Sequence, residues 1–144
     1  MPYLRLENGG LGVSQLALSQ VITTAGTVIG ETFTVPAAGL ITARAELAYG
    51  SGGTTAKAFL QTSLDNGATW VDIATLAFLL ANATKISAVR RDIALAPATV
   101  PTDGTLADDT LKDGLFGGLY RVKLVSTGTY ATSTTLTVWL TFGV

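Results

Sequence analysis

The sequence predicts an all-β protein, an antiparallel β-sandwich of about eight strands of the jelly-roll type, with an N-terminal arm and one long acidic loop. Two observations indicate this class. Apolar and polar residues alternate with a period of two in several segments, which is typical of strands with one buried face. Clusters of Gly, Pro, Asn and Asp separate these segments. An immunoglobulin-like sandwich is the alternative, but a chain without cysteine lacks the Cys…Trp…Cys signature.

The N-terminal segment is expected to be an arm. Residues 1–15 are rich in glycine and mixed in polarity, and we expect a single β-sandwich domain over residues 16–144. A free arm would expose its apolar side chains. It is therefore expected to form an edge strand of its own domain or to add a strand to a neighbour's sheet. The candidate interaction residues of the arm are Tyr3, Leu4, Arg5 and Leu6.

Strands are expected in eight segments of the chain. In chain order they are LALSQVIT (16–23), ETFTVP (31–36), LITARAELAY (40–49), KAFLQTSL (57–64), TWVDIATLAFL (69–79), KISAVRRDIAL (85–95), YRVKLV (120–125) and TTLTVWLTF (134–142). The third segment shows the alternation clearly, because every second residue from Ile41 to Tyr49 is apolar. Residues 72–81 also fit the i, i+3, i+4, i+7 spacing of a helix. We favour a strand there, because the preceding hairpin leads directly into it.

The stretch SLDNGATW fits the pattern S-x-D-x-G-x-T-W, the Asp box of sialidases and other β-propellers. The chain has one such box and is too short for a propeller. The residue types suit a tight hairpin, because Asp and Asn tolerate turn geometry and Gly supplies a positive φ. The flanking hydroxyl groups can bond across the strand ends, and the Trp covers the turn. We interpret the stretch as a structural hairpin built by Ser63, Asp65, Gly67, Thr69 and Trp70.

A long acidic loop is expected over residues 97–118, PATVPTDGTLADDTLKDGLFGG. Loops longer than about 12–15 residues in a compact domain are usually functional or disordered. Its carboxylates are expected to be solvated, and they belong to Asp103, Asp108, Asp109 and Asp113. Weak cation binding and glycoside hydrolysis are the alternatives, although the loop lacks the D-x-[DN]-x-[DN]-G order of a calcium site. We expect no catalytic residue, no metal site and no cofactor.

Three further residues are candidates for contact with a partner. Arg90 and Arg91 are adjacent on an expected strand, so their side chains should point to opposite faces. A simple surface pair and a salt bridge between subunits are the two alternatives. Trp139 falls on the Thr-rich face of the last strand, opposite the core residues. Either the same chain buries it, or it lies in an interface, where Trp is enriched.

Composition argues against several classes of function. The net charge is −1, with nine basic and ten acidic residues, which disfavours binding to nucleic acid or to an acidic membrane surface. Cysteine and histidine are both absent, which removes disulfides, thiolate metal sites and the commonest general base. No signal peptide or membrane-spanning run is visible. Only 13% of the residues are charged, which suits a Thr-covered β domain or a surface partly buried in an assembly.

Two segments resemble a pattern found in small virion proteins of tailed bacteriophages. In those proteins a hairpin of the form Q-x-S-x-D-x-G-x-T-W-x-D-I-A precedes R-V-K-x-x-x-T-G-T-Y and T-T-L-x-V. The corresponding segments run from Gln61 to Phe78 and from Arg121 to Val138. The resemblance covers the part of the chain from about residue 55 onward and leaves the N-terminal third and the acidic loop unmatched.

The resemblance implies a jelly-roll capsid cement or decoration protein, which binds the outside of the major capsid lattice and ties capsomers together. Such a protein is not an enzyme. Its implied partners are the major capsid protein and copies of itself, as a dimer or trimer. It would be made in the host cytoplasm and located on the outer surface of the virion. The alternatives are a tail, neck or fibre-associated virion protein, and a carbohydrate-binding sandwich with Trp70 or Trp139 as the stacking platform.

Overall fold

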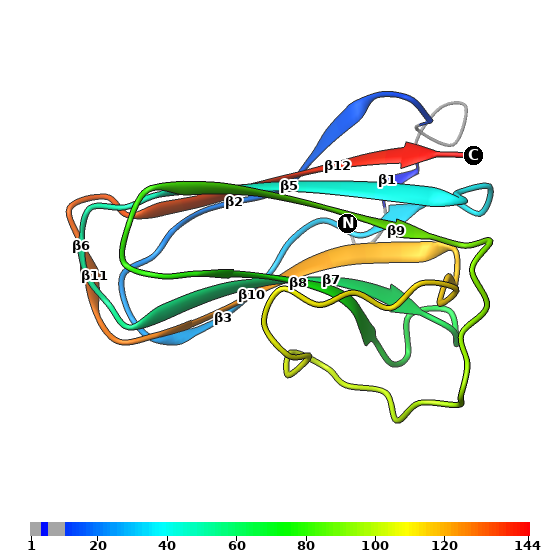
Figure 1. Cartoon of the computed structure of the whole chain (residues 1–144). Coiled ribbons are helices and arrows are strands. Elements are labelled where there is room, and N and C mark those ends of the chain that lie inside the picture. The colour runs from blue at the N-terminus through cyan, green and yellow to red at the C-terminus, as the bar shows by residue number, and fades with distance from the viewer. Residues whose placement is uncertain (1–3, 6–10) are drawn as a thin grey trace.

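Two β-sheets lie face to face in the structure, a computed structural model that describes residues 4–5 and 11–144 (Figure 1). The all-β class and the antiparallel sheets are confirmed. Residues 72–81, which also fitted a helical spacing, are mostly strand, as expected. The described residues contain no helix, and therefore none that could cross a membrane.

Six strands of the described chain form the first sheet. They are β1 (Leu4–Arg5), β3 (Gly26–Ile29), β4 (Phe33–Thr34), β7 (Thr55–Ser63), β8 (Val71–Phe78) and β10 (Leu119–Thr127). Strand β10 pairs with β7 on one side and with β3 and β4, one after the other, on the other side. Strand β8 lies beyond β7, and β1 pairs in parallel with β4.

Four strands form the second sheet within the described part of the chain, in the order β2-β12-β5-β9. They are β2 (Ser14–Val21), β5 (Leu40–Ala48), β9 (Ala83–Arg90) and β12 (Thr135–Gly143). All neighbours in this sheet are antiparallel. The short strands β6 (Ser51–Gly52) and β11 (Tyr130–Ala131) pair with each other at one end of the molecule (Figure 1).

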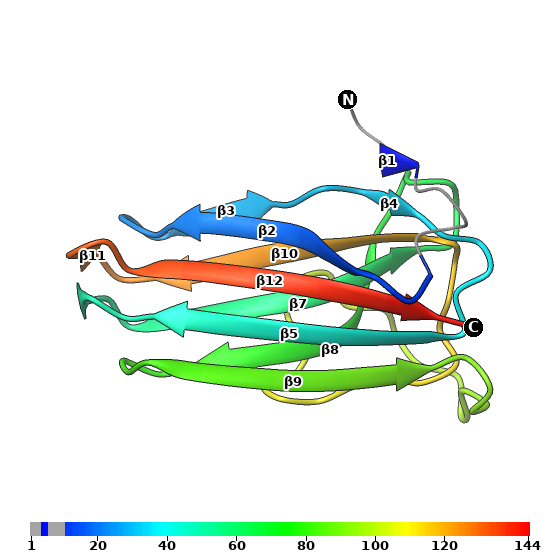
Figure 2. The ribbon, with the colours of Figure 1, turned by 90° about the horizontal axis from the view of Figure 1, so that it is seen from above.

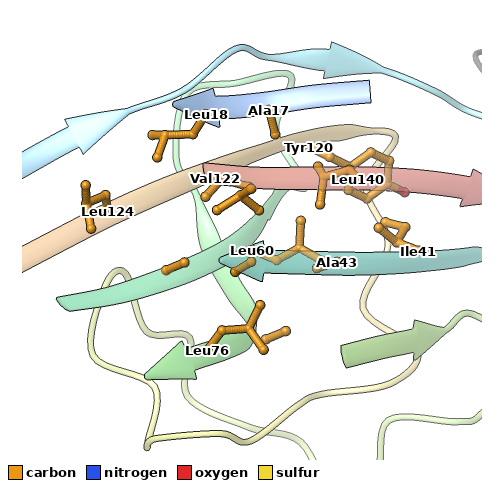
Figure 3. Close-up of a cluster of buried hydrophobic side chains, with 14 of the residues drawn as sticks. Ala17, Leu18, Ile41, Ala43, Leu60, Leu76, Tyr120, Val122, Leu124 and Leu140 are labelled. Carbon is orange, nitrogen blue, oxygen red and sulfur yellow. The ribbon is translucent and has the colours of Figure 1, made fainter. Parts of the chain in front are cut away.

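The core fills the space between the two sheets (Figure 3). Alternate residues of β12 are fully buried, as the period of two predicts, while the residues between them face outward. The rings of Phe33, Tyr120 and Phe142 meet in this core, with centroids 5.7 Å apart for Phe33–Phe142 and 5.5 Å apart for Tyr120–Phe142. Each such ring contributes roughly 1.5–3 kcal/mol through burial of apolar surface.

Strand β2 contains a β-bulge at Ala17. Leu18 pairs with Val138, but Leu16 pairs with Trp139, so Ala17 is the additional residue. Ala17 and Leu18 are both buried although they are consecutive, which a regular strand does not allow. The bulge therefore places Leu16 on the outer face of the sheet, beside Trp139.

The strands differ from the expected segments in a few places. Strand β9 ends at Arg90, so the end of the expected strand 85–95 belongs to the loop. The backbone turns there, and the Arg91 N–H donates to the carbonyl of Gly39. The ETFTVP segment forms only the two-residue strand β4. Strands β3, β6 and β11 were not expected, because they are too short to show an alternating pattern.

Candidate interaction surfaces

The long loop between β9 and β10 lies over the outer side of the six-stranded sheet (Figure 1). The carboxylate of Asp72 on β8 anchors it there. Asp72 is fully buried. Its oxygens accept hydrogen bonds from the backbone N–H groups of the loop and from two side chains: Gly104 (2.8 and 2.9 Å), Thr105 (3.0 Å), Leu106 (3.1 Å), the Thr102 hydroxyl (2.9 Å) and Gln61 Nε2 (2.9 Å). A buried carboxylate is tolerated only when its hydrogen bonds are satisfied in this way. Asp72 thus fixes the loop over β7 and β8.

Gln61 links this anchor to two basic residues of β10. Its side chain is fully buried, its Nε2 also donates to Asp103 at 2.6 Å, and its Oε1 accepts from Arg121 Nε at 2.9 Å. Lys123 pairs with Asp103 at 2.9 Å. Burial acts to raise the pKa of Asp103, but hydrogen bonds from Lys123 and Gln61 outweigh it and hold the pKa below its usual value. No buried side-chain nitrogen or oxygen of the described residues lacks a hydrogen-bond partner, so the cluster is a structural network.

The other acidic residues of the loop also have partners. Asp108 pairs with Lys57 and Asp109 with Lys85, both at 2.7 Å. Asp113 accepts from the backbone N–H of Arg90 at 2.7 Å. Asp103, Asp108 and Asp109 are about half exposed to solvent, as expected, and each also accepts from a specific group on a strand.

The loop also covers the free edge of β8. The Thr75 N–H donates to the carbonyl of Thr110, and the Lys112 N–H donates to the carbonyl of Ile73. The Ala77 N–H donates to Asp109 Oδ1 at 3.0 Å. An uncovered edge strand invites pairing with other chains, so the loop protects this edge of the sheet.

The loop presents apolar side chains to solvent, and we call them the loop patch. Its members are Ile93, Leu95, Val100 and Leu111, of which Val100 is 81% exposed. A shallow hollow beside Ile93, Leu95 and Leu111 is lined by residues 93–99 and 111–113. Leu111 lies between Thr110 and Lys112, which bond to β8, and Lys112 Nζ donates to the Thr99 hydroxyl at 2.9 Å. These contacts join the loop patch to β8 and to the neighbouring part of the loop.

A second apolar surface lies on the outer face of the four-stranded sheet. Strand register places Leu16, Trp139, Arg44 and Ile86 side by side in one row across β2, β12, β5 and β9. Leu16 is 45% exposed, Trp139 36% and Ile86 66%. We call these four residues the outer row. In Figure 2, which looks down on this sheet, no described segment crosses the middle of the face. Trp139 therefore points outward, as the alternation predicted.

The Asp-box residues form a hairpin between β7 and β8 that Asp65 holds together. Ser63 Oγ donates to Asp65 Oδ1 at 2.9 Å and accepts from the Gly67 N–H at 2.7 Å. The Thr69 backbone and hydroxyl donate to the Asp65 carboxylate at 2.8 and 2.6 Å. The Thr69 hydroxyl, the Thr69 N–H and the Ser63 hydroxyl lower the pKa of Asp65. We had expected the hydroxyls to bond across the strand ends. Instead, both bond to the Asp65 carboxylate.

Trp70 packs against a cation of the neighbouring strand. The guanidinium of Arg121 lies 4.3 Å from the centroid of the indole ring. A shallow depression beside them is lined by residues 68–71, residues 101–103 and Arg121. One face of the Trp70 ring is therefore already occupied.

The two arginines of the β9 end have local partners. Arg90 pairs with Asp92 at 2.8 Å, two residues along the chain. Arg91 lies beyond the end of β9, with its guanidinium 5.8 Å from the centroid of the Phe116 ring. The structure does not place these residues in the outer row. Leu4 and Arg5 of the arm form β1 beside Phe33 and Thr34, while Tyr3 and Leu6 lie outside the described residues.

Sequence reasoning missed the roles of Asp72 and Gln61. The available signal was weak: a single carboxylate and an amide within two strands that are otherwise mainly apolar or hydroxyl-bearing. Within residues 4–5 and 11–144, no three His, Cys, Asp or Glu side chains gather in a way that could hold a metal ion. No family model, curated protein or solved structure matches the chain. Function must therefore be argued from the surfaces themselves.

Proposed function

We propose that the chain is a structural protein of a virion, a capsid cement or decoration protein that binds the outside of the major capsid lattice and stabilises the shell. The observation that carries the proposal is the loop patch, a set of exposed apolar side chains on a long loop that other residues of the same loop attach to the six-stranded sheet. A cement needs a stiff body and preformed contact surfaces. Weak contacts of this kind, repeated over a symmetric shell, add through effective concentration.

The path of the chain supports the jelly-roll class within the β-sandwich. The chain runs from β2 to β3 and β4 in the other sheet, then back to β5, then across to β7 and β8. It crosses again to β9, to β10 and finally to β12. This repeated exchange between layers, with β2-β12-β5-β9 in one sheet and β4-β10-β7-β8 in the other, is typical of a jelly roll. Jelly rolls serve widely as building blocks of capsids.

The low charge of the exposed surface supports a role in assembly. Lys57, Lys85 and Lys123 are each paired with an acid of the loop. Because these charges are paired, the protein has a weak electrostatic field with which to attract a charged ligand. Only 13% of the residues are charged, which is low for a protein with a free surface. In the described chain four exposed aliphatic side chains lie in the loop patch and two in the outer row, while others lie at turns or elsewhere on strands, such as Val21, Ile29 and Leu40. Such patches mark contact sites when they are grouped.

The test compares two variants with matched exposure and equal change of charge. Val100→Asp places a carboxylate in the loop patch, while Leu79→Asp does so at the turn between β8 and β9, where Leu79 is 80% exposed. We expect the Leu79→Asp chain to bind particles as well as the unchanged chain does, and the Val100→Asp chain not to bind them. Equal binding of both variants would show that the loop patch is not the contact with the shell.

Particles assembled without the protein should release their genome at lower temperature or under milder osmotic shock. Particles that stay as robust as those carrying the protein would refute the cementing role. Copy number separates the cement from a tail, neck or fibre-associated protein, since a cement is present in hundreds of copies and a tail part in few. Quantitative mass spectrometry of purified particles gives this number.

Carbohydrate binding is a second candidate, favoured by the depression beside Trp70 and by the exposed ring of Trp139. Aromatic faces can stack on sugars, but Arg121 already occupies one face of Trp70. A glycan array that gives no signal, with no effect of Trp139→Ala, would remove this candidate.

A further inference from the structure

The outer row has apolar residues at both ends and two residues of complementary chemistry at its centre. Leu16 and Ile86 are the apolar ends, and Trp139 and Arg44 form the centre. Each strand lies about 4.8 Å from the next. An aromatic ring and a guanidinium attract when they stack, so the centre of the row complements itself when it is turned around.

The face around the outer row requires little desolvation of charge. The outward side chains of the described strands β2 and β12 carry no charge. On β5, Arg44 Nη2 pairs with Glu46 Oε2 at 3.1 Å, which neutralises both groups. The flat face of the guanidinium stays available for stacking. At the end of β9, Arg90 also faces outward and pairs with Asp92 at 2.8 Å. The other outward residues are mainly Ser, Thr and Ala, which are small and pack closely.

The face has nearly the area that a specific interface needs. Strands of eight or nine residues in a four-stranded sheet span about 30 Å by about 19 Å. That is on the order of 600 Å² before the relief of the side chains is counted, against roughly 800 Å² per partner in a standard interface. A contact of this size supports a dimer that dissociates on dilution.

We infer that a second copy of this chain packs on the outer face, about a twofold axis that runs along the strands between β12 and β5. This axis sets β12 against β5 of the other copy, so each Trp139 stacks on the other Arg44. It also sets each Leu16 against the other Ile86. An axis running across the strands would instead oppose Arg44 to Arg44, which like charges disfavour. Sheets pack face to face in this way about 10 Å apart.

The dimer goes beyond the proposed function and does not depend on it, because it uses the outer row while the proposed shell contact uses the loop patch. The two can therefore fail separately. A chain with Val100→Asp should lose the particle and keep the dimer. A chain with Trp139→Thr should no longer form the dimer, and this result does not depend on whether the chain still binds particles.

The first experiment measures mass against concentration by sedimentation velocity on the purified full chain. We expect a monomer–dimer equilibrium, weakened at least about tenfold by Trp139→Thr, as for a central interface residue. Ile86→Thr, on the edge strand, is a second variant that changes the row without touching the core. Val100→Thr, equally apolar but outside the row, is the control and should leave the equilibrium unchanged. A monomer at all concentrations, or a trimer, would overturn the inference.

The second experiment tests the direction of the axis. The natural chain has no cysteine, so single substitutions give unique labels. Chains carrying Leu16→Cys are mixed with chains carrying Ile86→Cys and treated with a short bis-maleimide linker. We expect the mixture to cross-link, and Leu16→Cys alone to remain largely monomeric, since its two copies would be roughly 17 Å apart. Val100→Cys controls for random collision. Strong cross-linking of Leu16→Cys alone would refute the proposed axis.

Discussion

The carboxylate of Asp72 and the backbone N–H of Gly104 are joined by a forked hydrogen bond, 2.9 Å to Oδ1 and 2.8 Å to Oδ2, across 32 residues of chain. Asp72 belongs to β8 and Gly104 to the long loop, so the bond joins the loop to the six-stranded sheet. Thr105 and Leu106 donate to the same carboxylate. One buried acid thus holds residues 102–106 of the loop against the sheet.

Asp72→Asn should destabilise the protein by about 2–4 kcal/mol. The amide has a single acceptor oxygen, and its NH₂ group would face backbone N–H donors that then remain unsatisfied in a buried site. The free energy of unfolding in urea measures the loss. Asp108→Asn is the matched control, because its ion pair with Lys57 is half exposed and should change stability by less than about 1 kcal/mol. Equal effects of the two variants would contradict the anchoring role of Asp72.

Acid should weaken the attachment of the loop. Asp109 has its pKa lowered by the hydrogen bond from the Ala77 N–H and by Lys85, and Asp103 also has a lowered pKa. A carboxyl group whose pKa is lower in the folded state stabilises the fold above its unfolded pKa, here 3.8, and loses that contribution as the pH falls through the folded pKa. Stability should therefore be flat from about pH 5 to 8 and decline below about pH 4.

Urea midpoints taken across this pH range test the prediction. Asp103→Asn should lower the midpoint near neutral pH and make its fall in acid shallower, because one of the titrating groups has been removed. A decline that starts above pH 6, where these carboxyl groups are all ionised, would point to another cause.

The sequence predicted the two-layer architecture well where alternation is regular. In β12 every second residue is buried, and Trp139 faces outward as the pattern indicates. Strands such as β3 and β6 were missed because four or two residues cannot display a period. The β-bulge at Ala17 was equally invisible, since only the register with β12 reveals the additional residue.

The candidate surfaces were only partly predictable. The Asp-box hairpin is local, so its residue types alone indicated a turn that Asp65 now holds together. The anchoring of the loop is not local, because Asp72 bonds to groups more than thirty residues away. The outer row likewise needs four strands in register, which no single stretch of sequence encodes.

Gly117→Ala should be severely destabilising, by more than about 3 kcal/mol. A Cβ atom at Gly117 would overlap the backbone carbonyl of Ser63, which the register with β10 holds in place. Backbone cannot move aside as a flexible side chain can. Gly26→Ala is the control, since a Cβ there meets nothing within 4 Å and should change stability by less than about 1 kcal/mol. Thermal unfolding of both variants measures these losses of stability. A mild effect of Gly117→Ala would contradict the close approach of Gly117 to the backbone of Ser63.

Arg121→Lys should release Trp70 although the charge is kept. Lysine lacks the flat guanidinium that stacks on the indole ring, and it lacks the Nε–H that donates to the buried Gln61. We expect a loss of about 1–2 kcal/mol and a shift of Trp70 fluorescence toward that of a solvated indole. The chain has two tryptophans, so the measurement is made with Trp139→Phe in every chain, which leaves Trp70 as the emitting indole. Arg44→Lys, at a half-exposed position of the outer row, is the control and should leave the emission unchanged. If Arg121→Lys also leaves the emission unchanged, the guanidinium of Arg121 does not hold the Trp70 ring. Both faces of that ring would then be open to stacking on a sugar in the depression beside it.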